Sequence, residues 1–139
     1  YTTTETHLNK IIQSYKSRNI IPILDYALEN NKDIDSFVKK KFELFDKYPN
    51  NYHSFKVSSI EFCQSAFLEV IEHAKLRNCK VLLDAENFKT QHIVDDLYDH
   101  IVSINYDFDI FKTYQMYRTG MMDNLLMDIE EFRRCNLIH

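Results

Sequence analysis

Glycine is almost absent from this sequence, in which Gly120 is the single example among 139 residues. Nucleotide-binding P-loops and GxGxxG dinucleotide fingerprints both need several glycines, because the backbone must approach the phosphates closely. The count therefore excludes both motifs. If a nucleotide cofactor binds, its phosphates must be held in another way.

The sequence also has no long apolar run, no excess of positive charge and only three cysteines. No stretch approaches the roughly 18 apolar residues that span a membrane. The net charge of −4 gives no electrostatic reason to expect nucleic-acid binding. Cys63, Cys79 and Cys135 are odd in number and widely spaced, which is typical of reduced thiols rather than of a disulfide framework. We therefore expect a reducing compartment, mitochondrial or cytoplasmic, and not secretion.

The first residue is Tyr1 rather than Met. We expect that residues before Tyr1 were trimmed or left out, so that a targeting peptide there would not be visible. The residues present are 45% hydrophobic and 27% charged, which is ordinary for a globular protein. Because no linker, low-complexity tract or clear repeat interrupts the chain, we expect one domain over residues 1–139, with a core of its own.

Apolar residues recur every three or four positions in five segments, which predicts five helices. The first covers 5–19, the second runs from Asp33 or Asp35 to Tyr48, the third covers 63–78, the fourth is capped by Thr90, and the last ends near Arg134. Short runs rich in β-branched and aromatic residues lie between them. These runs predict strands at 20–26, 55–60, 80–83 and 110–115.

After a leading helix within 1–19, the predicted order over residues 20–139 is βαβαβαβα. This alternation predicts an α/β fold with a parallel sheet and right-handed crossovers. Four βα units are half of a TIM-type barrel, which has eight units and typically about 250 residues. An open, doubly wound sheet is the alternative, and periodicity alone does not separate the two.

Two of the predicted strands end in polar side chains. The first is KVLLDAE at 80–86, and the second leads into TYQMY at 113–117. In parallel β/α barrels the active site lies at the carboxyl ends of the strands. The two segments therefore predict neighbouring parts of an active-site floor.

Four short words follow one another on the predicted strands: ILDYALE at 23–29, FKVSS at 55–59, VLLDAE at 81–86 and TYQMY at 113–117. They resemble, in order, signature words of the FAD-dependent proline dehydrogenases, and residues 5–19 resemble the helix that precedes that family's barrel. The resemblance implies a distorted TIM barrel with FAD at the strand carboxyl ends. It also implies oxidation of L-proline to pyrroline-5-carboxylate by hydride transfer, with electrons passed to a quinone through peripheral contact with a membrane.

The same resemblance assigns roles to three residues. Lys56 resembles the family's strand lysine beside flavin and substrate, and Asp84 resembles the aspartate of the proline pocket that bonds this lysine. Gln115 resembles the glutamine that bonds the flavin ring, a role that suits an amide because it both donates and accepts. A lysine in a barrel lumen needs a partner, so we expect Lys56 and Asp84 to pair. Ser58, Ser59, Met116 and Arg118 depart from the family words and leave specificity open.

Two further parts of the family pattern do not occur in this sequence. One is a Lys-Leu-Val-Arg-Gly-Ala-Tyr word whose arginine contacts the flavin, and the other is an arginine pair for the proline carboxylate. We therefore expect the N-terminal half of a catalytic barrel, inactive as this segment alone. One alternative is a non-catalytic half-barrel that self-associates through open edges and through exposed lumen residues such as Val57, Leu82 and Phe111, or the residues that alternate with them. The other is a flavodoxin-like binding domain.

Each candidate also has a purely structural interpretation. Without the family words, Asp84 and Glu86 would be taken as caps of the next helix, and Lys56 as a strand residue whose ammonium reaches water. The lysines at 39–41 fit a solvated helix face. Three polar residues lie at the i, i+4 and i+8 spacing of a metal site, but no HExxH word supports a metal, and a solvent-facing stripe is favoured: His92, Asp96 and His100.

Overall fold

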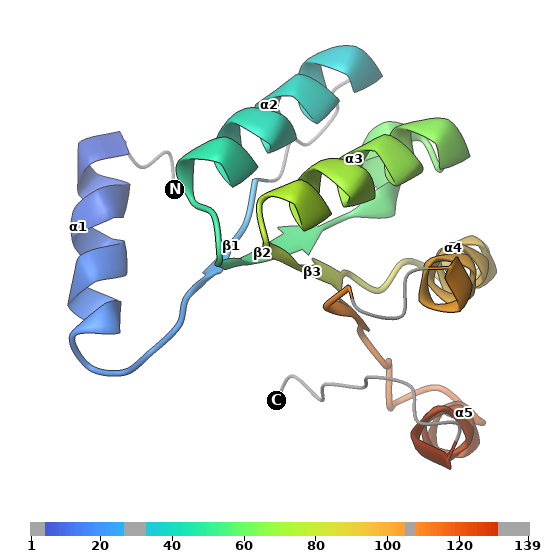
Figure 1. Ribbon diagram of the computed structural model, residues 1–139. Helices are drawn as coiled ribbons and strands as arrows, with labels where there is room; N and C mark the ends of the chain where they lie inside the picture. The colour runs from blue at the N-terminus through green and yellow to red at the C-terminus, as the bar shows by residue number, and fades with distance from the viewer. Residues whose placement is uncertain (1–4, 27–32, 105–107, 131–139) are drawn as a thin grey trace.

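The computed structural model describes residues 5–26, 33–104 and 108–130 (Figure 1). Along the chain its elements are α1 (Glu5–Lys16), β1 (Ile23–Leu24), α2 (Ile34–Lys47), β2 (Tyr52–Phe55), the 3₁₀ helix η1 (Val57–Ile60), α3 (Gln64–Leu76), β3 (Lys80–Leu83), α4 (Gln91–Ile104), β4 (Ile110–Lys112) and α5 (Met121–Glu130). The predicted alternation of helix and strand is therefore present. None of the described helices has the length and apolar character needed to cross a membrane.

The four described strands form one parallel sheet in the sequential order β1-β2-β3-β4. A doubly wound sheet reverses its strand order, which places helices on both faces. Sequential order with crossovers of one hand keeps the connecting helices on one face. Figure 1 shows α2, α3 and α4 fanned around the same side of the sheet. This arrangement is that of consecutive units of a β/α barrel.

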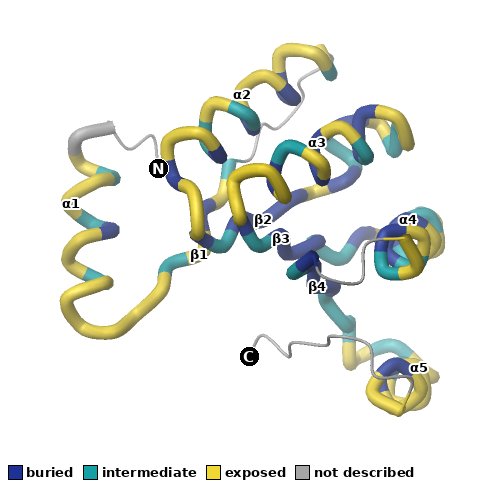
Figure 2. The backbone as a smooth tube through the Cα atoms, viewed as in Figure 1, coloured by how far each residue is buried: buried dark blue, intermediate teal, exposed yellow. Residues whose placement is uncertain are grey.

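The main core fills the space between this sheet face and helices α2, α3 and α4. Figure 2 shows that the buried sides of these helices face the strands. Aromatic rings line up across the layer, because Phe55 on β2 stacks between Phe37 on α2 and Phe67 on α3, with ring centroids 6.2 and 5.9 Å apart. A smaller cluster of Ile12, Leu24 and Tyr48 attaches α1 to β1 and to the end of α2.

The boundaries of the helices agree closely with the sequence. Asp33 caps α2, its carboxylate accepting from the Ser36 N–H at 3.1 Å. The fourth helix begins at Gln91, directly after Thr90. The final predicted helix is present as α5 up to Glu130, and its expected continuation to Arg134 lies outside the described residues.

The second predicted strand is wrong in position. The strand is Tyr52–Phe55, which shares only Phe55 with the FKVSSI run, and Val57–Ile60 forms a 3₁₀ helix instead. This helix is closed by two successive residues in the left-handed region, Glu61 (φ 51°) and Phe62 (φ 56°). The first and fourth strands are shorter than expected, Ile23–Leu24 and Ile110–Lys112. Residues 20–22 lie before the first strand, and after the fourth the Thr113 N–H still bonds to the Leu83 carbonyl at 3.2 Å.

The expectation of exposed lumen residues is also wrong. Val57, Leu82 and Phe111 are all buried, at 0%, 5% and 7% exposure. Phe111 stacks against Tyr52 of β2, with centroids 6.1 Å apart, so the inner face of the sheet carries apolar contacts of its own.

Candidate functional site

Polar side chains gather at the carboxyl edge of the sheet, where the sequence places its three candidate residues. Lys56 follows β2, Asp84 follows β3 and Gln115 lies three residues beyond β4. Because neighbouring strands are parallel and in register, all three residues leave the sheet at the same edge.

Asp84 is held by β2 but not by Lys56. Its Oδ1 accepts a hydrogen bond from the Ser54 hydroxyl at 2.9 Å. Lys56 is exposed and makes no ion pair with Asp84 within the described residues. The expected pair is therefore not formed, because the ammonium of Lys56 remains in water and does not require a buried partner.

Glu86 joins three segments of this edge and was considered in the sequence only as a helix cap. Its Oε1 accepts from the Ser58 backbone N–H at 3.1 Å, and its backbone N–H donates to the Gln91 side chain at 2.7 Å. Its carbonyl accepts from Gln115 Nε2 at 3.0 Å. The carboxylate is buried and directed to η1 rather than to the start of α4. Glu86 thus fixes the loop after β2 and the loop after β4 against the loop after β3.

Gln115 has hydrogen-bonding capacity to spare. One N–H of its amide is bound to Glu86, and its carbonyl oxygen accepts from Arg118 at 2.5 Å. A primary amide has two N–H groups and two acceptor lone pairs, so one of each remains. This donor set fits the edge of a flavin ring, which both donates and accepts.

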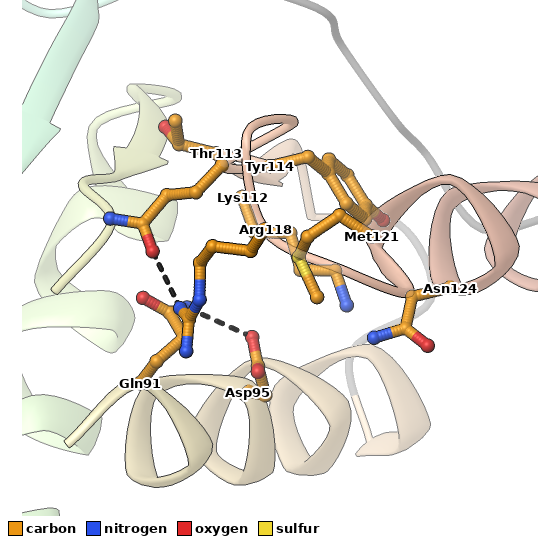
Figure 3. A pocket seen from close by; sticks show the side chains of 9 residues that line it. Gln91, Asp95, Lys112, Thr113, Tyr114, Arg118, Met121 and Asn124 are labelled. Atoms are coloured by element: carbon orange, nitrogen blue, oxygen red, sulfur yellow. Dashed lines mark hydrogen bonds between the residues drawn. The ribbon is translucent and has the colours of Figure 1, made fainter. Parts of the chain in front are cut away.

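A small cavity lies beside Gln115, between α4 and the segment from β4 to α5 (Figure 3). Its volume is about 20 Å³, enough for a water molecule and not for a cofactor. In Figure 3, Arg118 reaches over the cavity toward Gln91 and Asp95 of α4, and Lys112 approaches from the strand. The guanidinium of Arg118 also lies 5.0 Å from the centroid of the exposed Phe88 ring.

Lys112, one of the residues that line this cavity, also anchors α5. Its Nζ lies 2.6 Å from Asp128 Oδ2, and each side chain is only about a tenth exposed. The ammonium lies 5.0 Å from the ring centroids of Tyr98 and Tyr114, and the Tyr114 hydroxyl also bonds to Asp128. A buried ion pair with this many partners holds α5 against β4 and α4.

Lys41 is the charged residue that the sequence analysis misplaced. Lys39 and Lys40 are exposed as expected, but Lys41 is fully buried and its Nζ donates to the Ser54 carbonyl at 2.6 Å. Burial lowers the pKa of Lys41 to about 8, against the opposing effect of the Asp25 and Asp84 carboxylates. The helical spacing of the sequence could have indicated that Lys41 is buried. Position 41 is four residues from both Phe37 and Phe45, on the buried stripe of α2.

The polar stripe on α4 faces solvent. His92, Asp96 and His100 are all exposed. Among the described residues, no group of three His, Cys, Asp or Glu side chains is arranged to hold a metal ion.

Comparison with known proteins identifies this arrangement. The family model described as proline dehydrogenase matches residues 4–137. The chain belongs to the proline dehydrogenase family. Its fold is also similar to a crystal structure of proline utilization A (PutA) from Bdellovibrio bacteriovorus inactivated by N-propargylglycine. That match has a TM-score of 0.78 and 12% sequence identity, and covers 95% of this chain and 18% of that chain. A search of curated proteins found no match.

Family membership explains the shape of the sheet. The four parallel strands and their helices correspond to part of a proline dehydrogenase barrel, as the sequential strand order indicates. The carboxyl edge that carries Asp84 and Gln115 is the edge at which such barrels place their chemistry.

Proposed function

We propose that this chain forms the N-terminal half of a proline dehydrogenase barrel and contributes Lys56, Asp84 and Gln115 to its active site. The family match carries the proposal, and the shared edge of Asp84 and Gln115 supports it. In the complete barrel the substrate is L-proline, the product is pyrroline-5-carboxylate, and the electrons pass to a quinone-type acceptor.

The residues divide the work by their chemistry. FAD, when bound, accepts the hydride from proline. Gln115 offers its free N–H and lone pair to the flavin edge, while its bond to Glu86 fixes the amide plane. The Ser54 hydroxyl orients Asp84 by donating to its Oδ1, and Oδ2 is the oxygen that we assign to the substrate. The exposed ammonium of Lys56 is free to approach Asp84 once opposing strands exclude water.

The test uses the complete protein that contains these residues. Flavin absorbance is measured after purification, and reduction of a dye is then followed with and without L-proline. We expect Asp84→Asn to reduce proline-dependent kcat/KM by at least tenfold with flavin still bound, whereas Asp96→Asn on the exposed face of α4 should leave it unchanged. A complete protein that carries FAD and does not respond to proline would refute the proposed substrate.

The roles of Lys56 and Asp84 are tested by a double-mutant cycle on the free energy of unfolding. In the 139-residue chain, Lys56→Met should change stability by no more than about 0.5 kcal/mol. Asp84→Ala should cost about 1 kcal/mol for the lost Ser54 bond, and the two should add. In the complete barrel the pair should become non-additive. Additivity in both proteins would refute the lumen pairing.

A second candidate is a non-catalytic module that self-associates. It is favoured by the outer face of α5, where Met122, Leu126 and Ile129 are 55%, 48% and 51% exposed. Apolar side chains at this spacing form one continuous stripe, which a second copy of the chain would cover. Sedimentation of the 139-residue chain should then show a dimer that Leu126→Glu dissociates. A monomer at micromolar concentration would exclude this candidate.

A further inference from the structure

Lys41 brings a positive charge to the carboxyl end of β2 from the helix side of the sheet. The residue is fully buried, and its Nζ lies 5.7 and 5.8 Å from the ring centroids of Phe37 and Phe55. Burying an ammonium is costly unless it is bonded. Here the bond is to the Ser54 carbonyl, at 2.6 Å.

The position of this carbonyl explains why it needs a donor. The carbonyls of Asn51 and Phe55 accept from the N–H groups of Lys80 in β3 and of Asp84 directly after it. The alternating carbonyl of Ser54 therefore points to the other side, toward β1. The β1 ladder ends at Leu24, which pairs with His53. Lys41 therefore supplies the hydrogen-bond donor that the next residue of a longer β1 would have provided.

Ser54 also contacts the candidate site, through its side chain. The Ser54 side chain is on the lumen face, and its hydroxyl donates to Asp84 Oδ1 at 2.9 Å. One residue thus accepts from Lys41 through its backbone and donates to Asp84 through its side chain. The Asp84 carboxylate in turn favours the charged form of Lys41, as does Asp25. The two groups interact through space as well as through Ser54.

We propose that Lys41 is a positioning residue of the active site, which acts through Ser54 to orient the Asp84 carboxylate. This inference rests on the proposed function, in which Asp84 contacts the substrate. Lys41 is on the opposite side of the sheet from the lumen and does not touch the substrate itself.

The charge of Lys41 makes this role dependent on pH. Three titratable groups face it from the packed strands: Asp25 beyond β1, His53 on β2 and Asp84 beyond β3. Since burial lowers the pKa of Lys41 to about 8, the ammonium loses its charge as the pH rises through this value. An arginine at position 41 would stay charged over the whole range.

The experiment compares Lys41→Met, Lys41→Arg and the control Lys40→Met in the complete protein. Lys40 is adjacent in sequence but exposed, paired with Glu43 at 2.7 Å. The kcat and KM for L-proline are measured from pH 6.5 to 10. We expect Lys41→Met to lower kcat/KM about ten- to hundredfold, and Lys40→Met to have no effect. Lys41→Arg should retain activity and carry it to higher pH than the wild type.

Adding Ser54→Ala tests the route. If Lys41 acts through Ser54, the loss in the double variant with Lys41→Met should be no larger than that of the more impaired single variant. Losses that multiply would overturn the proposal. So would a Lys41→Met enzyme with an altered melting temperature but wild-type kinetics and pH profile, because that result describes a purely structural lysine. If Lys41→Met does not fold, a Lys41→Arg profile that falls at the wild-type pH overturns it as well.

A readout without turnover separates this proposal from the proposed function. The melting temperatures of Lys41→Met, Asp84→Asn and the double variant form a second cycle. If the protein does not oxidise proline but the melting temperatures are non-additive, the proposed Lys41–Ser54–Asp84 coupling is supported and only the proposed substrate is refuted. Additivity would overturn the coupling whether or not the enzyme is active.

Discussion

His53 gives the fold a specific sensitivity to acid. The ring is fully buried on β2, edge-on to Phe45, with centroids 4.8 Å apart. Its Nε2 lies 3.1 Å from the Tyr48 carbonyl, which requires the tautomer with a proton on Nε2. Nδ1 is buried and has no hydrogen-bond partner among the described residues. A second proton would put a charged, unpaired N–H into an apolar layer that already contains the Lys41 ammonium.

Burial accordingly lowers the pKa of His53 from 6.5 to about 4, with a smaller contribution from Lys41. Because the pKa in the folded state is below that in the unfolded state, the unfolded chain binds more protons between these values. The contribution of His53 to the free energy of unfolding is therefore fully present above about pH 6.5. It falls as the pH is lowered, by up to about 1.4 kcal/mol per pH unit. The full loss is about 3 kcal/mol, of which about 2 kcal/mol occurs above pH 5.

Urea unfolding at several pH values measures this loss, followed by circular dichroism because the chain has no tryptophan. The comparison variant is His53→Gln, whose amide can donate to the Tyr48 carbonyl and does not titrate. We expect the stability of the wild type, relative to His53→Gln, to fall by about 2 kcal/mol between pH 7 and 5. His92→Gln, at an exposed position on α4, is the control and should follow the wild type. Parallel curves for wild type and His53→Gln would refute the argument.

Three further predictions concern packing and backbone, each measured as the free energy of unfolding. Lys112→Met should cost about 3–5 kcal/mol because it leaves the Asp128 carboxylate buried without its cation; adding Asp128→Leu should recover most of this, and simple additivity would contradict the buried pair. Ile71→Ala should cost about 2–5 kcal/mol at a fully buried site, whereas Leu76→Ala on the same helix, 75% exposed, should stay within about 0.5 kcal/mol. Gly120→Ala should cost about 1–2 kcal/mol through the backbone alone, since φ is +84° and no atom lies within 4 Å of an added Cβ; an unchanged stability would contradict this.

Local pattern was sufficient to predict most of the fold. The helical period located α2 and α3 to within one or two residues, and the strand at 80–83 was placed correctly because it is a continuous apolar run between polar ends. The resemblance chose the barrel over the doubly wound sheet, and the sequential strand order agrees with that choice. Periodicity carries no information on strand order, so it could not have made this distinction.

Three of the errors have a common cause, because each depends on a hydrogen bond between segments that are distant in sequence. FKVSSI has the composition of a strand, but the Ser58 N–H is bonded to Glu86, 28 residues later. The run at 39–41 resembles a solvated face, but Lys41 finds a carbonyl on β2 that no local pattern reveals. Asp84 was identified correctly as a residue of the strand edge, whereas its hydrogen-bond partner proved to be Ser54 rather than Lys56.

The sequential order of the sheet also has a consequence for how the chain folds. Each strand pairs with the preceding one at a separation of 28 or 29 residues, as in Leu24 with His53, His53 with Val81, and Val81 with Ile110. No described strand must wait for a distant segment, so the loop closed at each step is short and its entropic cost is similar each time. A chain emerging from the ribosome can therefore dock one βα unit at a time onto the units already formed, with β4 as the growing edge.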